Sequence, residues 1–256
     1  QTQWEITERL QLLAGIRRDA YSDFGSEVTW RGGVSWRVPV TETLLHANYG
    51  TAFAPPTPQD REPALFGVAT LLKPELSRGI EFGFTQPLLD EKLTASVTWF
   101  RNDIRNFIEF DPILFALQQI DRARTEGVEC QLSFRPCDRV QMSLGYTHLD
   151  AANVSDGRRL VRRPRHTVTA QMTVQPVDPV TVGFTANWSI DREDGFGAGQ
   201  SDQEDFLNVR LFANWQVTEN VSLFGRIENL LGDDYQAARG FPSLDTGAYG
   251  GVKVKF

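Results

Sequence analysis

Apolar and polar residues alternate with a period of two along most of this chain. Between residues 167 and 175 the even positions are Val, Ala or Met and the odd positions are Thr or Gln. Residues 180–191 repeat the design, with Val182, Phe184 and Trp188 on the apolar side. Successive side chains of a strand point to opposite faces, so this pattern predicts strands with one apolar and one polar face.

The same alternation predicts twelve strands and no helix. Several of these strands exceed ten residues, whereas strands of soluble proteins usually run ~5 to 6 residues. Long strands suit a tilted crossing of a membrane whose apolar band is ~25 Å tall. The predicted strands cover residues 6–20, 26–39, 41–51, 77–88, 91–108, 118–136, 138–150, 164–176, 179–191, 203–217, 220–230 and 245–256.

The connections between these strands alternate between tight and long. The tight ones centre on residues 39–41, 89–91, 136–138, 176–179 and 218–220. The others are long, at residues 52–76, 109–117, 151–163, 192–202 and 231–244, and the first, near 22–25, is the short exception. Outer-membrane barrels have short periplasmic turns and longer extracellular loops. The pattern predicts an all-β fold, a transmembrane antiparallel up-and-down β-barrel with its long loops outside.

Composition and charge argue against a nucleic-acid partner and against a soluble β-sandwich. A net charge of −7 and a pI near 5.1 argue against a nucleic-acid partner, which needs a concentrated basic surface. A soluble β-sandwich would also alternate, but its solvent face would carry more Lys and Glu than the Thr, Ser, Asn, Gln and Gly found here. The chain ends on Phe256 after Val252 and Val254, which resembles the terminal signal that barrel-assembly machinery reads.

Several short motifs resemble the β-barrel domain of TonB-dependent outer-membrane receptors. They occur in that family's order and span nearly the whole chain. They are YGTAFAPPT at 49–57, LKPE at 72–75, FRNDIRNFI at 100–108, TEGVE at 125–129, GYT at 145–147, RRPRH at 162–166 and ENLL at 228–231, with Asp234-Tyr235 before the last strand.

The resemblance implies a 22-stranded barrel of the bacterial outer membrane, closed by a separate plug domain. Such a barrel imports a scarce small molecule or metal chelate, of the iron–siderophore or cobalamin type, with energy from the TonB complex. Residues 1–256 would then be the C-terminal portion of the barrel, about 12 of 22 strands, without the plug domain and the N-terminal strands. A self-contained 12-stranded barrel, enzyme or pore, and a soluble β-rich binding domain stay open as alternatives.

Transport of this kind needs no catalytic residue and no cofactor. The resemblance places the ligand site on the extracellular loops and the upper lumen wall, where the candidates are Phe53, Arg61, Phe196, Tyr235, Arg239 and Phe241. Arginine forks bind phosphate well, so a run of loop arginines is a candidate contact with lipopolysaccharide, against the alternative of pairing with Asp150 or Asp156. That run is Arg158, Arg159, Arg162, Arg163 and Arg165.

Metal sites are not expected. His46, His148 and His166 are far apart in the sequence and lack metal-ligand spacing. Acidic residues flank glycines 195–199, where calcium binding is weighed against a mobile charged loop. Tryptophans and tyrosines near strand ends predict two interfacial girdles; they are Trp30, Trp36, Trp99, Trp188, Trp215, Tyr146 and Tyr235.

Overall fold

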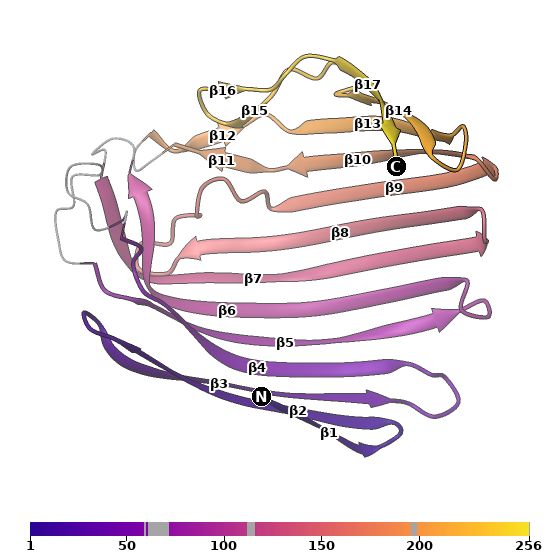
Figure 1. Ribbon diagram of the computed structural model, residues 1–256. Coiled ribbons are helices and arrows are strands. Elements are labelled where there is room, and N and C mark those ends of the chain that lie inside the picture. Colours follow the sequence, from indigo (N-terminus) through magenta and orange to yellow (C-terminus); the bar gives the residue numbers. More distant parts are fainter. Residues whose placement is uncertain (59, 61–71, 112–115, 196–198, 256) are drawn as a thin grey trace.

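Thirteen strands form one antiparallel sheet in which each strand pairs with the next long strand of the chain (Figure 1). The computed structural model describes residues 1–256 except 59, 61–71, 112–115, 196–198 and 256. The strands are β1 (Thr2–Thr7), β2 (Leu10–Tyr21), β3 (Gly25–Arg37), β4 (Leu44–Ala54), β5 (Glu75–Leu88), β6 (Leu93–Asp111), β7 (Ala116–Cys137), β8 (Val140–Asn153), β9 (His166–Val177), β10 (Val180–Ile190), β13 (Phe206–Gln216), β14 (Val221–Glu228) and β17 (Gly247–Val254). Two short hairpins lie in the loops, β11 (Arg192–Asp194) with β12 (Ser201–Gln203) and β15 (Gln236–Ala238) with β16 (Phe241–Pro242).

The first predicted strand, residues 6–20, is instead a hairpin of β1 and β2, which raises the count from twelve to thirteen. The turn contains no Gly or Pro. Its signal is the hydroxyl of Thr7, which accepts hydrogen bonds from the backbone N–H groups of Arg9 (3.2 Å) and Leu10 (3.0 Å). A threonine turn of this kind reverses the chain without interrupting the apolar alternation on either side.

The register keeps apolar and polar residues on separate faces. Trp188 of β10 lies opposite Val168 of β9 and Leu207 of β13. One step along, Asn187 lies opposite Asn208. Side chains of directly opposed residues share a face, so the apolar set forms one continuous surface and the polar set the other. We call these the outer face and the inner face.

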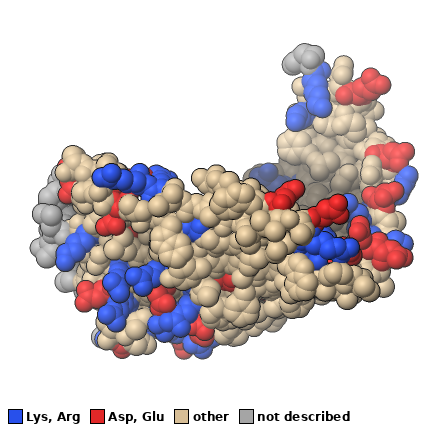
Figure 2. All heavy atoms as spheres, turned by 90° about the horizontal axis from the view of Figure 1, so that it is seen from below, with Lys and Arg blue, Asp and Glu red and all other residues tan. Residues whose placement is uncertain are grey.

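The outer face is a wide apolar surface with little buried beneath it. Large side chains on it stay exposed, such as Ile16 at 76% and Phe82 at 54%. Uncharged surface spans the middle of the molecule in Figure 2, with charged groups gathered toward its ends. Water would penalise so much apolar area, whereas hydrocarbon does not, so this face meets the bilayer. The described residues contain no helix long and apolar enough to span a membrane.

The inner face is packed closely by aromatic rings lying over glycines. Phe212 is directly opposite Gly183, and its ring covers the space that a Cβ on Gly183 would occupy. The carbonyl of Met172 closes the same space from the other strand. Glycine at this position lets a ring lie flat against the wall without displacing the backbone.

The two ends of the strands differ. One carries tight turns and the other carries the long connections, which we call the turn end and the long-loop end (Figure 1). One connection is shorter than predicted, because β6 runs to Asp111 and β7 starts at Ala116, where the sequence indicated a loop over 109–117. These two strands therefore extend beyond the membrane band.

The loop after β8 folds inward over the long-loop end. Leu160, which is 4% exposed, packs on Ala123 of β7 and Ala151 of β8. Both alanines lie on the inner face by register. At the sheet's two edges β1 and β17 are not paired with each other, so the described strands do not close into a 12-stranded barrel (Figure 1).

Candidate functional site: the extracellular mouth

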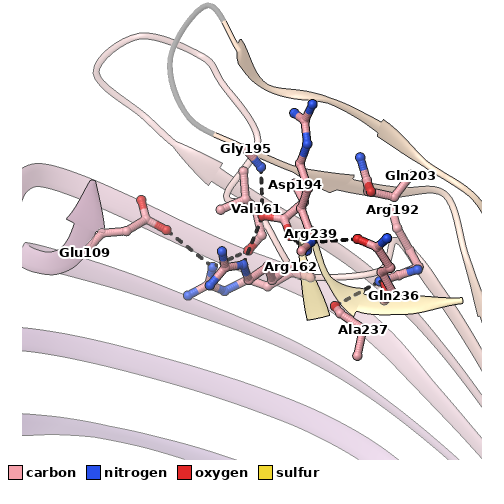
Figure 3. Close-up of polar contacts among 12 residues, drawn as sticks. Glu109, Val161, Arg162, Arg192, Asp194, Gly195, Gln203, Gln236, Ala237 and Arg239 are labelled. Carbon is pink, nitrogen blue, oxygen red and sulfur yellow. Dashed lines mark hydrogen bonds and ion pairs between the residues drawn. The ribbon is translucent and has the colours of Figure 1, made fainter. Parts of the chain in front are cut away.

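Three loops meet at the long-loop end around the carboxylate of Asp194, which is 2% exposed. This carboxylate accepts hydrogen bonds from the backbone N–H groups of Gly195 (2.7 Å) and Arg239 (2.6 Å). The side-chain Nε of Arg162 donates a third, at 2.9 Å. Figure 3 shows these donors converging on Asp194 from separate loops. One buried acid therefore joins the segments after β8, β10 and β14.

Arg192 makes the second connection between loops. Its guanidinium donates to the carbonyls of Glu204 (2.9 Å), Gln236 (2.7 Å) and Ala237 (2.9 Å), which fixes the β15 hairpin to the β11 hairpin (Figure 3). The same group lies 4.6 Å above the ring of Phe206. Carbonyl acceptors carry no full charge, and burial lowers the pKa of Arg192 despite the opposing effect of the nearby Asp194 and Asp205 carboxylates.

Phe206 also stacks on Tyr235, with ring centroids 3.9 Å apart and planes 4° from parallel. The hydroxyl of Tyr235 accepts a hydrogen bond from the amide of Asn208 at 2.9 Å. Asn208 is an inner-face residue of β13. The cation, the phenyl ring and the phenol therefore form one layered stack that anchors the last loop to the inner wall.

A second group of charges surrounds Arg159. Its guanidinium contacts the carboxylates of Asp191 (2.8 Å) and Glu193 (2.6 Å). Arg165 joins the same group by pairing with Asp191 at 3.0 Å. Asp191, Glu193 and Asp194 thus each have an arginine partner, so these three carboxylates are not free for the calcium alternative.

The pairing changes the acidity of these groups. A hydrogen bond from Arg159 lowers the pKa of Asp191 below its usual value, with further help from the charges of Arg159 and Arg165. Burial works to raise the pKa of Asp194, but the N–H groups of Arg239 and Gly195 together with Arg162 outweigh it and the pKa is lowered. Both acids are therefore ionised at neutral pH, and the mouth is held by charge-assisted hydrogen bonds.

The predicted lipopolysaccharide arginines all have carboxylate partners. Arg159, Arg162 and Arg165 pair as described, Arg163 approaches Glu109 at 3.7 Å, and Arg158 approaches Asp156 at 3.9 Å. The pairing with Asp150 and Asp156 that the sequence left open is present in Arg165 and Arg158. Contact of this run with lipopolysaccharide stays a prediction.

The predicted ligand residues that the structure describes do not form one cluster. Tyr235 is half-buried in the stack with Phe206 and is not part of an interfacial girdle. Arg239 donates its backbone N–H to Asp194. Phe241 is 72% exposed on the β15–β16 hairpin. Phe53 contacts the ring of Tyr21, with ring centroids 5.6 Å apart. It lies on the outer face, as Leu45 does. Arg61 and Phe196 lie outside the described residues.

Sequence reasoning missed one cluster. His148 and His166 are opposite one another across β8 and β9, with ring centroids 5.0 Å apart. The hydroxyl of Tyr146 lies 2.8 Å from Nδ1 of His166. The long loop between Asn153 and His166 joins β8 to β9, so no tight turn in the sequence fixes the register that brings these residues together. Among the described residues no group of three or more His, Cys, Asp or Glu is arranged to hold a metal.

The fold and this mouth define a class of protein. It is the wall of a membrane-spanning β-barrel whose long loops are tied into an ordered rim. Comparison with known proteins identifies the class further, because residues 1–230 match the family model described as TonB dependent receptor-like, beta-barrel. The chain belongs to the family of TonB-dependent receptors, which are outer-membrane proteins of Gram-negative bacteria.

Individual proteins are similar to the chain in sequence or in fold. The chain is 29% identical over 229 residues to the vitamin B12 transporter BtuB of Vibrio vulnificus, a match that covers 88% of this chain and 36% of that protein. A variant of the ferric enterobactin receptor PfeA of Pseudomonas aeruginosa, in complex with enterobactin, superposes with a TM-score of 0.81 at 20% identity, covering 98% of this chain and 44% of that one. The copper transporter OprC gives 0.78 at 18% identity, over 99% and 46%. The chain thus spans less than half the length of these relatives.

Proposed function

We propose that this chain forms part of the wall of an outer-membrane importer. The importer binds a scarce small molecule or metal chelate, of the iron–siderophore or cobalamin type, at the extracellular mouth. The TonB complex supplies the energy that carries the ligand inward. The observation that carries this proposal is the mouth itself, where Asp194 and Arg192 tie three loops of a family barrel into one rim.

The inner wall supports passage of a polar ligand. Below the mouth, a hollow of about 270 Å³ is lined mainly by small polar groups and one cation. Hydroxyl and amide side chains can exchange hydrogen bonds with a moving ligand or with water at little cost, because none of them carries a charge that must be neutralised. The polar lining consists of Ser143, Thr169, Gln171, Thr185, Asn187, Asn208 and Arg210.

We further propose that additional strands complete this wall and that a plug domain closes the barrel. The edge strands β1 and β17 each present backbone N–H and C=O groups without a partner among the described residues. Open edges invite pairing with other strands, and lipid offers no hydrogen bonds to them. The coverage of 36% to 46% of the relatives' lengths is consistent with further segments that supply the plug and the contact with TonB.

Cobalamin is the first ligand to test, because the relative with 29% identity is a vitamin B12 transporter. The full-length protein carrying this chain is expressed in a Gram-negative host that lacks its own cobalamin and siderophore receptors. Uptake of labelled cyanocobalamin and of labelled ferric siderophores is then measured with and without functional TonB. TonB-dependent accumulation of one ligand class is expected. Equal uptake in both strains, or uptake of neither class, would contradict the proposal.

A further inference from the structure

Five arginines lie on the outer face of β5, β6 and β7, just beyond the apolar band at the long-loop end. We call them the outer arginine patch. They are Arg78, Arg101, Arg105, Arg122 and Arg124. None belongs to the run that the sequence singled out for contact with lipopolysaccharide, and none takes part in the mouth.

The register fixes the side of the wall on which the patch lies. Arg101 and Arg105 follow Trp99 on β6 at intervals of two, so they share its outward face. Arg78 lies opposite Asp103, which in turn lies opposite Arg124. The patch therefore continues the face that meets the bilayer, and it does not point into the lumen.

The position of the outer arginine patch relative to the membrane follows from β6. Arg101 is two residues beyond Trp99, a rise of about 7 Å along the strand. Trp99 packs on Phe82 with ring centroids 5.1 Å apart, which is the kind of aromatic contact that marks the interface of a barrel. Arg101 and Arg78 therefore stand at the level of lipid headgroups, and Arg105 stands further out. Figure 2 shows charged side chains of both signs toward the ends of the molecule, where the uncharged surface gives way.

The patch has more positive than negative charge. Asp103 pairs with Arg101 (3.0 Å) and Arg124 (2.7 Å), and Glu126 approaches Arg101 at 4.0 Å, so two carboxylates lie among the five arginines. Arg105 and Arg122 lie directly opposite each other on adjacent strands, both exposed. Like charges in that position repel, and among the described residues neither side chain has a carboxylate partner. A bound anion would relieve this repulsion.

Room for an anion exists beside these groups. A hollow of about 540 Å³ is lined by all five arginines, by the acids Glu27 and Asp103, and by apolar residues that include Val28, Trp30 and Leu76. Guanidinium groups on three neighbouring strands can present paired N–H donors to phosphate oxygens. The apolar residues suit the glycolipid backbone and the first carbons of its chains.

We propose that the outer arginine patch binds the phosphate groups of lipid A, the membrane anchor of lipopolysaccharide. The outer leaflet around barrels of this family is rich in lipopolysaccharide phosphates. In the loop after β8, Arg159, Arg162, Arg163 and Arg165 are already paired with carboxylates, whereas this patch keeps uncompensated charge. The inference depends on the outer-membrane placement of the chain and not on the import of any ligand.

The test measures lipid A binding to the full-length protein in detergent micelles. The probes are bisphosphorylated lipid A, dephosphorylated lipid A and phosphatidylglycerol, each followed by native mass spectrometry. The double variant Arg105→Gln with Arg122→Gln removes the unpaired cations, and Arg78→Gln serves as an independent single variant. The matched control, Arg37→Gln with Arg139→Gln, removes two exposed cations at the turn end.

Bisphosphorylated lipid A is expected to bind more tightly than the other two probes. The double variant should weaken its binding by about tenfold or more, since each lost arginine removes a charge-assisted hydrogen bond. Arg78→Gln should weaken it less, and the control should not. Three results would overturn the assignment: equal binding of dephosphorylated lipid A, equal binding of phosphatidylglycerol, or equal loss in the control. If Arg158→Gln with Arg163→Gln abolishes binding instead, the site is at the mouth. A heat-modifiable gel shift confirms that each variant is folded.

Discussion

Replacing Asp194 by alanine should release the extracellular mouth while leaving the barrel wall folded. The carboxylate accepts from two backbone N–H groups, those of Gly195 and Arg239, and from Arg162. Each buried donor left without an acceptor costs ~1 to 3 kcal/mol, so the two backbone groups set a loss of ~2 to 6 kcal/mol for the closed rim. Arg162 adds less, because its side chain is 52% exposed and water can replace its partner.

Hydrogen exchange of the full-length protein in lipid nanodiscs measures this loss locally. A loss of ~3 kcal/mol corresponds to exchange about 100-fold faster at the amides of Gly195 and Arg239. Asp194→Asn keeps one acceptor oxygen and should show a smaller change. Asp202→Ala removes an exposed acid of the same loop and is the matched control. If Asp194→Ala exchanges no faster than Asp202→Ala, or if amides of β10 accelerate equally, Asp194 is not the local tie of the mouth.

The remaining predictions concern pH and the two faces of the wall. The lowered pKa values of Asp191 and Asp194 mean that the mouth keeps its full protection above the ordinary carboxyl range, ~4, and loses it as pH falls through the depressed folded values. If hydrogen exchange shows that the loops lose protection already near neutral pH, the lowered direction of these two pKa values is wrong. Leu211→Arg on the outer face should reduce the free energy of folding into lipid vesicles by ~2 to 4 kcal/mol, while Gln171→Arg on the inner face should change it little. Comparable losses in urea titrations of both variants would show that the faces are misassigned. Gly183→Val should lower the yield of heat-modifiable barrel, because its side chain would displace a ring and a carbonyl; an unchanged yield would mean that the wall is loosely packed there.

Period-two alternation was sufficient to predict the strands, because a wall between hydrocarbon and water imposes one chemistry on each face. The strand predicted at residues 179–191 agrees with β10 to within one residue at each end, and the strand predicted at residues 26–39 lies close to β3. Alternation cannot reveal a turn when the apolar residues stay at the same alternate positions before and after it. The hairpin at Thr7 was missed for that reason, as its only signal is one hydroxyl.

The mouth could be located from sequence but not assembled. The acids and arginines of residues 158–165 and 191–205 were recognised as charged loops, yet their pairing depends on how the loops fold inward. Leu160, packed on the inner-face alanines, turns its arginine neighbours toward Asp191 and Asp194 rather than toward the lipid. Conversely, Arg105 and Arg122 could have been placed on the outer face from alternation alone, but their adjacency requires the register of β6 with β7.

Spin labels along β10 test most directly whether hydrocarbon and water meet opposite faces of this wall. Cysteines are introduced one at a time into the full-length protein in lipid bilayers, after Cys130→Ser and Cys137→Ser remove the two free thiols. Labels at 182, 184 and 186 should be relaxed by oxygen dissolved in lipid, and labels at 181, 185 and 187 by a water-soluble nickel chelate. Two accessibility profiles that rise and fall together along the strand would contradict the account.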